Sequence, residues 1–411
     1  MIIRRIPEDF AVVEHLVDSY TASVSTERGY CQYALYQLRK TSLTTPQATA
    51  MLAKLIGYRA SSVQHAGLKD KHAVTTQHVT VGPVPAGAPV PPTIGGGQIS
   101  ARLAGYVTQP IDARAIQYNA FVLVVRSADK SDYAMVQSRL AEMSVEASAQ
   151  NAAGLLVSNY FGDQRFGSAR HGEGFAAARA IKGDALGALK LMIATPARKD
   201  TGPLREFTRM AATQWGAWAA LADALPPLPQ RKAIGALARG ATPEQALSAL
   251  PPDDLRWCVE AYQSWLWNKT AARVVADLAV KDDGAKAWTV ESEYGDMLFV
   301  PARVIPAALH GATLPTFGPG LLVLESWGSA ARAVLGEEGI SPADLTVPGI
   351  PEMKFGIVSR PLFARVGEVS LSAAHHDELG AERSAKPLKF TLKCTLPKGC
   401  YATVLLRAFG Q

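Results

Sequence analysis

Strand-like alternation at both ends of the chain, with helical spacing between them, most constrains how this sequence can fold. Residues 2–16 alternate about a Pro-Glu-Asp turn, and residues 99–109 and 116–126 also read as strands. From about residue 160 to 278, alanine and helical spacing dominate, and residues 388–409 return to strands around a Pro-Lys-Gly turn. One simple account is a discontinuous domain made from both ends, with a second domain inserted in the middle.

Several segments carry helix signals. The apolar spacing of residues 30–40 is typical of a helix, and residues 131–150 have an amphipathic pattern. A further helix is predicted from Thr45, as N-cap, to a stop at Gly57. In the middle of the chain, the Thr-Pro-Glu-Gln run at residues 242–245 forms a capping-box helix start. These signals predict a mostly helical middle and mixed α+β ends.

The composition sets the class of protein. The 411 residues are 48% hydrophobic and 19% charged, which suits two or three domains with a sizeable core. Lys and Arg number 42 against 36 for Asp and Glu, so an anionic partner is permitted but not required. The four cysteines form no CxxC pair, the N-terminus lacks a signal-peptide core, and no apolar run approaches the roughly 20 residues that span a bilayer. We expect a soluble protein of the reducing cytoplasm, away from membranes.

One acid stands among fixed positive charges. In "HAGLKDKHAVTTQHVTV", residues 65–81, Asp70 lies between Lys69 and Lys71. Flanking lysines favour the charged carboxylate, which suits a nucleophile and suits a general acid badly. The alternative is a solvated turn of mixed charge, and the local sequence alone favours that interpretation.

Two histidine clusters resemble metal sites. His65, His72 and His78 surround Asp70, but their spacing matches no ligand signature and the adjacent lysines would repel a cation. The "HHDE" run at residues 375–378 lies in a Ser-, Ala- and charge-rich stretch and predicts a solvated loop. Motifs for phosphate loops, dinucleotide turns, active serines and zinc are missing, so we expect no metal and no cofactor.

The segment "NYFGDQRFG", residues 159–167, couples aromatic residues with Arg165 and two glycines. Nucleobases stack on aromatic side chains and arginine binds phosphate, so the segment suits RNA binding. It equally suits a domain-linking segment with Tyr160 and Phe161 in a core. Both interpretations stay open.

Four separated motifs together resemble the TruD family of tRNA pseudouridine synthases. "PEDFAVVE" at residues 7–14 resembles the N-terminal motif of the family, and "AGLKDKHAVT" at 66–75 resembles its catalytic motif. "NYFGDQRFG" resembles the segment entering its inserted domain, and "LPKGCYATVLLRAF" at 396–409 resembles its C-terminal motif. The motifs occur in the order of the family and span nearly the whole chain.

The resemblance implies a function. An enzyme of this family isomerises uridine to pseudouridine in tRNA, here at position thirteen in the D arm, by breaking the C1′–N1 bond and rejoining the ribose through C5. No redox change or energy source is needed, which agrees with the missing cofactor motifs. The partner would be tRNA, and no obligate protein partner is inferred. The alternatives are a catalytically silent RNA-binding protein or tRNA chaperone on the same scaffold, and a metal-dependent hydrolase.

The resemblance also implies a fold. It is α+β, with a mixed, largely antiparallel sheet and flanking helices as in pseudouridine synthases, plus an inserted α/β domain. We expect residues 1–157 and 345–411 to form the discontinuous catalytic domain. Residues 158–344 would form the inserted, TruD-specific domain, with a cleft between the two for tRNA.

Residue by residue, the motifs imply a site. Asp70 matches the catalytic aspartate, and whether it attacks C1′, adds to the base or helps to remove a ribose proton stays open. The residues that match uridine-binding positions are Phe10, Asn119, Phe121 and Tyr401. The candidates for contact with RNA phosphates are Arg4, Lys69, Lys71 and Arg165. Two positions depart from the family pattern: Tyr401 is Phe in relatives, and Tyr118 replaces the Gly of a more usual "GNAF".

Overall fold

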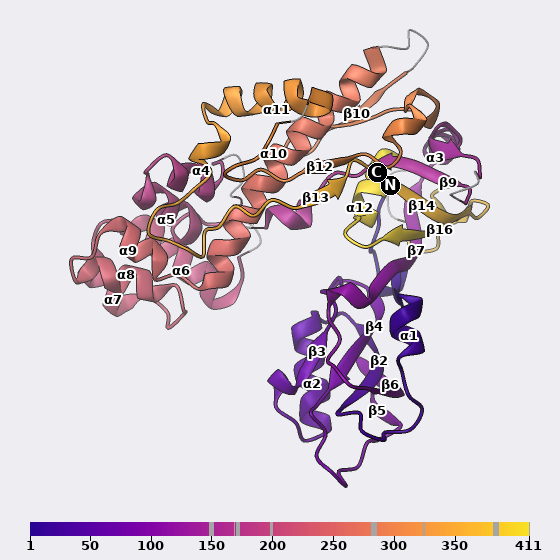
Figure 1. Cartoon of the computed structure of the whole chain (residues 1–411), viewed down its shortest axis with the longest axis horizontal. Helices are drawn as coiled ribbons and strands as arrows, with labels where there is room; N and C mark the ends of the chain where they lie inside the picture. The colour runs from indigo at the N-terminus through magenta and orange to yellow at the C-terminus, as the bar shows by residue number, and fades with distance from the viewer. Residues whose placement is uncertain are drawn as a thin grey trace. The chain divides into compact units, whose positions relative to one another are not determined.

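Figure 1 shows the computed structural model of the chain, which describes residues 1–147, 152–167, 169, 173–197, 200–280, 286–323, 325–380 and 386–410. The chain divides into two compact units. The first, here called the sheet unit, comprises Met1–Val157 and Ala364–Gln411. The second, here called the helical unit, comprises Ser158–Phe363.

The domain boundaries predicted from the sequence follow residues 157 and 344. The two compact units of the structure are divided after Val157 and after Phe363. Strand β13 (Ser359–Pro361) pairs antiparallel with β12 (Thr313–Pro315), and the Leu362 amide donates to the Ala312 carbonyl across 2.9 Å. The segment before Phe363 is therefore hydrogen-bonded into the helical unit.

One large mixed sheet organises the sheet unit. In the described residues its strands run in the order β5-β6-β2-β4-β1-β7-β16-β14-β9-β8, with β3 on β4 and β15 on β16. The strands are β1 (Phe10–Leu16), β2 (Tyr33–Thr41), β3 (Val63–His65), β4 (Val74–Val81), β5 (Thr93–Gly96), β6 (Ile99–Val107), β7 (Ile116–Ala128), β8 (Ser144–Val145), β9 (Gly154–Ser158), β14 (Phe363–Leu371), β15 (His375–His376) and β16 (Leu388–Pro397). The pair β1–β4 is parallel, whereas β1–β7, β7–β16, β2–β4 and β2–β6 are antiparallel. The predicted mixed, largely antiparallel sheet is confirmed.

The register of β1 and β7 defines one face of this sheet. Phe10, Val12 and Glu14 alternate along β1 and are all buried. Val12 lies opposite Phe121, and Glu14 lies opposite Asn119. Directly opposed residues of an antiparallel pair share a face, so these five side chains lie on one side of the sheet, here called the inner face.

Strands β2 and β4 extend the inner face with polar side chains. Val12 is in register with Thr75 of β4, and Thr75 is in register with Lys40 of β2. Gln77, two residues after Thr75, lies on the same side by alternation. Lys40, Thr75 and Gln77 are all buried. The inner face therefore carries a row of buried polar groups beside the aromatic residues of β1 and β7.

In the part of the chain that the structure describes, the sheet is flanked by α1 (Asp18–Ala22), α2 (Thr45–Leu55), α3 (Lys130–Met143) and α12 (Ala402–Ala408). Helix α2 packs its Leu52 into a core cluster with Tyr36 and Leu38 of β2. Its N-cap is Thr44, one residue before the predicted cap, and Thr44 and Gln47 form a capping box. This cap fixes the start of α2, next to the loop that carries Asp70.

Two predictions of secondary structure are wrong. Residues 30–40 were predicted as a helix, but residues 33–40 lie in strand β2. Leu35 is buried on the opposite face from Ala34 and Tyr36, so apolar residues occupy consecutive positions at 33–36, and that pattern mimics helical spacing. At the C-terminus, the turn after β16 leads into helix α12, not into a second strand. Val404, Leu405 and Ala408 of α12 are buried at helical spacing despite a β-branched local sequence.

The helical unit is built around α10 (Pro252–Val280), a 29-residue helix that contacts α4, α11, β11 and β12. Its other elements are α4 (Ala176–Ile181), α5 (Ala185–Ile193), α6 (Gly202–Thr213), α7 (Trp218–Ala224), α8 (Arg231–Ala238), α9 (Pro243–Ser248), α11 (Glu325–Glu338) and the hairpin β10 (Trp288–Val290)–β11 (Met297–Phe299). The predicted capping box of Thr242 and Gln245 starts α9. Within the described residues, no helix, α10 included, has the length and apolar character needed to cross a membrane.

Candidate active site

Asp70 lies in the connection between β3 and β4. Hydrogen bonds with buried side chains anchor the backbone of this loop. The Thr45 hydroxyl accepts a hydrogen bond from the Lys69 amide across 3.0 Å and donates to the side chain of Gln77 across 2.9 Å. The Gln77 amide group in turn donates to the Gly67 carbonyl across 3.3 Å. The backbone just before Asp70 is therefore anchored to α2 and to the inner face.

Lys40 completes this anchoring from β2. Its Nζ donates to the carbonyls of Leu43 and Asp70, each across 2.7 Å, and to the Lys69 carbonyl across 3.4 Å. The residue is 0% exposed. Burial lowers the pKa of Lys40 to about 8; the Asp70 carboxylate opposes this shift and the Lys69 ammonium adds to it. Buried polar groups are costly unless hydrogen-bonded, and here the loop carbonyls supply the partners.

Arg4 forms an ion pair with the Asp70 carboxylate. Its Nη2 donates to Asp70 Oδ1 across 2.8 Å, and both side chains are 22% exposed. The guanidinium carbon lies 4.1 Å from the ring centroid of Phe10, a cation–π contact. Arg4 has a φ of 61°, in the left-handed region that non-glycine residues rarely adopt. Its Nε is buried without a hydrogen-bond partner in the described structure. A strained backbone therefore presents this arginine to the acid.

The two lysines that flank Asp70 in the sequence have other surroundings. Lys69 Nζ lies 2.6 Å from Glu14 Oε2, with both side chains buried, whereas Lys71 is exposed. Glu14 Oε1 also accepts a hydrogen bond from the His78 amide across 2.8 Å. Burial by itself raises the pKa of Glu14, but hydrogen bonds from His78 and the charge of Lys69 outweigh it, so the pKa lies below its usual value. Lys69, one of the two flanking lysines, therefore has a buried glutamate as its ion-pair partner.

The predicted aromatic residues meet on the inner face. The rings of Phe10 and Phe121 lie edge to face, with centroids 6.0 Å apart and an interplanar angle of 80°. Asn119 precedes Phe121 by two residues and therefore lies on the same face of β7. Its Oδ1 is buried and lacks a hydrogen-bond partner in the described structure. Burying an amide oxygen without a hydrogen bond costs free energy of folding. The Asn119 oxygen is therefore a candidate acceptor for a hydrogen bond from a bound molecule.

Tyr401 is the half-buried N-cap residue of α12. It follows β16, whose Pro397 is in register with Tyr118 and whose Leu396 is in register with Asn119. The turn before Tyr401 therefore begins at the strand end where Asn119 lies. Tyr118 alternates with Asn119 and stacks on His15, with centroids 4.5 Å apart. Tyr118, which replaces the glycine of the more usual "GNAF" motif, thus lies on the opposite face of the sheet from Asn119.

Arg165 belongs to the helical unit. Its Nη1 lies 2.8 Å from Glu260 Oε2, so an acid of α10 already pairs with this predicted phosphate ligand. Tyr160 and Phe161 of the same segment are buried, and the Tyr160 hydroxyl donates to the Leu298 carbonyl across 2.8 Å. Of the two interpretations of this segment, the structure favours the one that places both aromatic rings in a core.

The predicted solvated loop at residues 375–378 is wrong in one respect. The two histidines are exposed on β15, but Asp377 is buried and lies 2.6 Å from Arg126 Nη1. Arg126 also pairs with Asp9 across 2.8 Å, so this acid serves a buried ion-pair cluster. Among the residues that the structure describes, no group of three His, Cys, Asp or Glu side chains is arranged to hold a metal ion.

The buried polar residues of the inner face, among them Glu14 and Lys40, were not predicted from the sequence. A signal for both was present in the alternation. Glu14 continues the apolar series of Phe10 and Val12, and Lys40 continues that of Tyr36 and Leu38. A charged residue at a buried position of a strand must find a partner, so such a position indicates a structural or functional ion pair.

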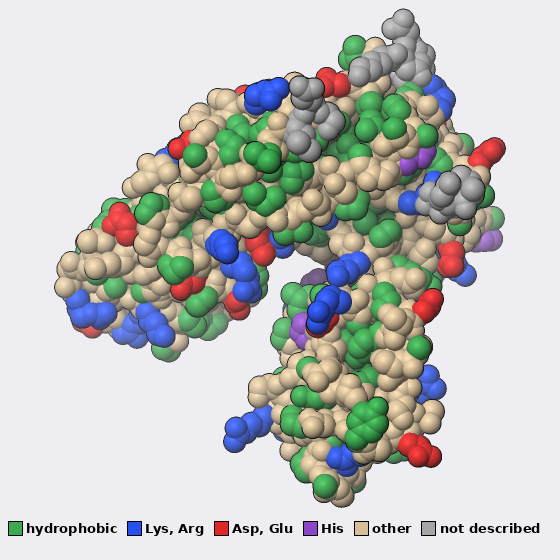
Figure 2. Space-filling model, in the orientation of Figure 1, with side chains coloured by type: hydrophobic (Ala, Val, Ile, Leu, Met, Phe, Trp, Pro, Cys, Tyr) green, Lys and Arg blue, Asp and Glu red, His purple; other side chains and the backbone are tan. Residues whose placement is uncertain are grey.

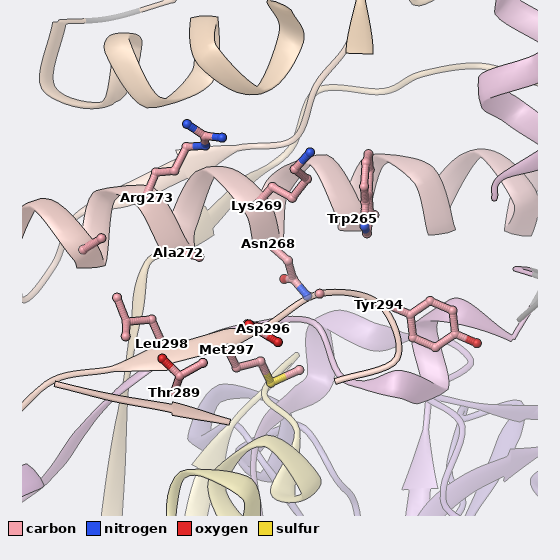
Figure 3. A pocket seen from close by; sticks show the side chains of 12 residues that line it. Trp265, Asn268, Lys269, Ala272, Arg273, Thr289, Tyr294, Asp296, Met297 and Leu298 are labelled. Atoms are coloured by element: carbon pink, nitrogen blue, oxygen red, sulfur yellow. The ribbon is translucent and has the colours of Figure 1, made fainter. Parts of the chain in front are cut away.

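A separate cavity of about 420 Å³ lies in the helical unit, between α10 and the β10–β11 hairpin (Figure 3). Its lining includes Trp265, Lys269 and Arg273 of α10 and Tyr294 of the hairpin. Lys269 Nζ lies 4.5 Å from the Trp265 ring centroid and 2.9 Å from a Glu337 carboxylate oxygen, and Arg273 also pairs with Glu337. Both cations are thus paired with acids of α11, Glu337 and, for Lys269, also Glu338.

The family sequence model described as tRNA pseudouridine synthase D (TruD) matches residues 1–409. A probable tRNA pseudouridine synthase D 1 of Methanococcus maripaludis is 24% identical over 92% of this chain and 93% of its own. The tRNA pseudouridine synthase D of Aquifex aeolicus is 27% identical over 92% and 91%. A crystal structure titled putative tRNA pseudouridine synthase D (TruD), from Methanosarcina mazei, is similar with a TM-score of 0.68 and 22% identity, over 99% of this chain and 92% of that one. That likeness confirms the fold class.

Proposed function

This chain belongs to the tRNA pseudouridine synthase D (TruD) family of isomerases, and we propose that it converts uridine to pseudouridine at position thirteen of tRNA. The reaction breaks the C1′–N1 bond and joins C1′ to C5 of the same uracil, and the C5 proton is lost as N1 gains one. Atoms and electrons balance without a co-reactant. The observation that carries the proposal is the Asp70 carboxylate, anchored through its backbone and paired with Arg4 beside Phe10.

In this proposal Asp70 is the catalytic residue. A nucleophilic aspartate reacts in its ionised form, as the carboxylate. The ion pair with Arg4 is an interaction that this ionised form makes. The hydrogen bonds from Lys40 and Thr45 to the loop backbone support the role, because a reacting group must be held within a fraction of an ångström of its productive position. Attack at C1′, addition to the base and removal of a ribose proton all require this placement.

The inner face is proposed to hold the extruded uracil. A uridine in its stack is out of reach, so the base must leave the stack at a cost of a few kcal/mol. Contact with the rings of Phe10 and Phe121, and with Tyr401, offsets about 1–3 kcal/mol per stacked base. Asn119 Oδ1 needs a donor, and the N3–H of uracil is one. Cytosine has an acceptor at that position, so this contact favours uridine.

The proposed RNA contacts of the backbone are electrostatic. Figure 2 shows Lys and Arg side chains interspersed with acidic and apolar ones over the visible face. Of the predicted phosphate ligands, Lys71 is exposed, while Lys69, Arg4 and Arg165 pair with carboxylates. We therefore assign Lys71 as a phosphate contact beside the site, and we expect the other three to act through their ion pairs.

The test is to incubate the purified chain with an unmodified tRNA transcript carrying uridine at position thirteen and to map pseudouridine by carbodiimide modification and primer extension. The proposal expects one new stop at that position, with or without a metal chelator. Binding without modification would identify a silent RNA-binding protein, and activity lost with the chelator would identify a metal-dependent enzyme. A stop at another uridine would retain the reaction and correct the position.

A further inference from the structure

Leu68 is an exposed apolar residue beside the acid. It stands two residues before Asp70 in the loop of residues 66–73 and is 68% exposed. Two residues of chain span at most about 7 Å, so its backbone lies within that distance of the backbone of Asp70. Single exposed apolar residues are common and need no explanation by themselves. Leu68 differs from such cases because the backbone beside it is hydrogen-bonded to buried side chains.

The backbone on both sides of Leu68 is anchored by buried side chains. Before it, the Gly67 carbonyl accepts a hydrogen bond from Gln77, and after it, the Lys69 amide donates to Thr45. Lys40 then holds the carbonyls of Lys69 and Asp70. The backbone at Leu68 is thus anchored on both sides, and its side chain points to solvent. Because the side chain is mostly exposed, it adds little to the hydrophobic core. The structure holds this side chain exposed, on a backbone that lies within about 7 Å of that of the acid.

Extruding a nucleotide leaves a gap in the RNA stack, between the two bases that flanked it. Apolar side chains, leucine among them, can insert between the base steps of a nucleic acid. A leucine cannot bind phosphate or a base edge, whereas the exposed Lys71, three residues further on, can. The loop therefore presents an apolar group, the acid and a cation in succession, and each matches a different part of an RNA strand that has one nucleotide turned out.

We propose that Leu68 is the wedge that enters the RNA stack in place of the extruded uridine. This inference rests on the proposed function and deepens it, because it names the residue that sets how readily a stacked uridine reaches Asp70. Leu68 contacts the flanking bases and not the reacting atoms. Its loss therefore slows the modification of stacked uridines and spares uridines that are already unstacked.

The experiment measures single-turnover rates of pseudouridine formation on two tRNA transcripts with uridine at position thirteen. One is intact; the other has an abasic residue at position fourteen, so that one stacking partner is missing. Each variant is compared with the unsubstituted protein on the same transcript, so any general effect of the abasic residue on tRNA shape cancels. On intact tRNA, Leu68→Ala is expected to slow the reaction by about 10-fold or more, as loss of a stacking contact predicts. On the abasic transcript the slowing should shrink to about twofold.

Two variants serve as controls. Leu68→Met keeps an apolar side chain of similar volume and should recover most of the rate on intact tRNA. Leu55→Ala removes a leucine that is 58% exposed at the end of α2 and should leave both rates unchanged. The wedge is refuted if Leu68→Ala modifies intact tRNA at the unsubstituted rate, or if it slows both transcripts equally. Failure of the proposed function shows itself separately, as no pseudouridine from the unsubstituted protein on either transcript.

Discussion

The ε-amine of Lys40 donates a 2.7 Å hydrogen bond to the main-chain oxygen of Asp70, from the buried face of a strand 30 residues earlier in the chain. The same amine also donates to the Leu43 and Lys69 carbonyls. A single side chain therefore links the backbone just after β2 to the loop that carries Asp70. The placement of Asp70 therefore depends on a lysine that never contacts the substrate in our proposal.

Lys40→Met tests this dependence. Without the amine, the carbonyls at the base of the loop lose their donor and the loop shifts, and a shift of about 1 Å costs roughly 100-fold in rate. We expect turnover on tRNA to fall by about 10- to 100-fold while tRNA affinity stays nearly unchanged. Lys54→Met, at an exposed position of α2, is the matched control and should change neither. Equal turnover in the two variants would remove Lys40 from the account.

The pH dependence of stability provides a second test of Lys40. Its pKa of about 8 in the folded protein lies below the ordinary 10.5, so between these values the unfolded chain binds more protons than the folded one. The contribution of this group to the free energy of unfolding therefore rises with pH across that window. The difference in unfolding free energy between the unsubstituted protein and Lys40→Met should grow from about pH 8 to 10.5 and be flat below pH 8. Denaturant titrations at several pH values measure it, and a flat difference throughout would show an unshifted amine.

Arg4→Ala separates catalysis from stability at the site. The Arg4–Asp70 pair is partly exposed, and pairs of this kind contribute about 0–1 kcal/mol to stability. Removing the guanidinium also removes the cation from the carboxylate and the contact with Phe10, so we expect turnover to fall by at least about tenfold. Arg114→Ala, which breaks an exposed pair with Asp112, is the control and should leave turnover unchanged. A loss of stability without a loss of rate would make Arg4 a structural residue.

Phe121→Leu tests the aromatic part of the site with a substitution that preserves the core. Leucine keeps much of the buried volume, so the loss of stability should be about 1–3 kcal/mol. The aromatic face is lost, and turnover should fall more than tRNA affinity does, because one stack is a small part of a large interface. Phe390→Leu, in β16 against Tyr133 of α3, should cost similar stability and no turnover per folded molecule. Equal effects of the two variants on turnover would argue against a pocket at Phe121.

Much of the fold follows from the sequence because strand alternation and capping signals are local. The strands of residues 99–109 and 116–126 and the helix start at Thr242 could all be predicted from such signals. Residues 30–40 could not, since the consecutive apolar residues 33–36, with Leu35 buried on the second face, obscure the alternation of the strand. Distinguishing it from a helix needs the neighbouring strands, which a single segment does not reveal.

The site shows the same division between local and distant information. The motif around Asp70 identifies the acid, but not which cation faces it. The local sequence offered the two flanking lysines as nearby cations, whereas the structure pairs Asp70 with Arg4, 66 residues away, and Lys69 with Glu14. A buried charge without a partner carries a large desolvation penalty, so a nearby side chain of opposite charge turns toward it. Which charges are buried depends on tertiary packing, which a local motif does not reveal.

The central claim is that Asp70 performs the chemistry, and Asp70→Asn tests it most directly. Asparagine keeps the shape of the side chain and an oxygen for Arg4, so folding and tRNA binding should stay intact. The variant and the unsubstituted protein are incubated with the same tRNA transcript, and pseudouridine is counted by carbodiimide mapping, with Asp112→Asn as a control at an exposed carboxylate. The account predicts a loss of at least about a thousandfold for Asp70→Asn alone. Pseudouridine formed by Asp70→Asn at the unsubstituted rate would contradict it.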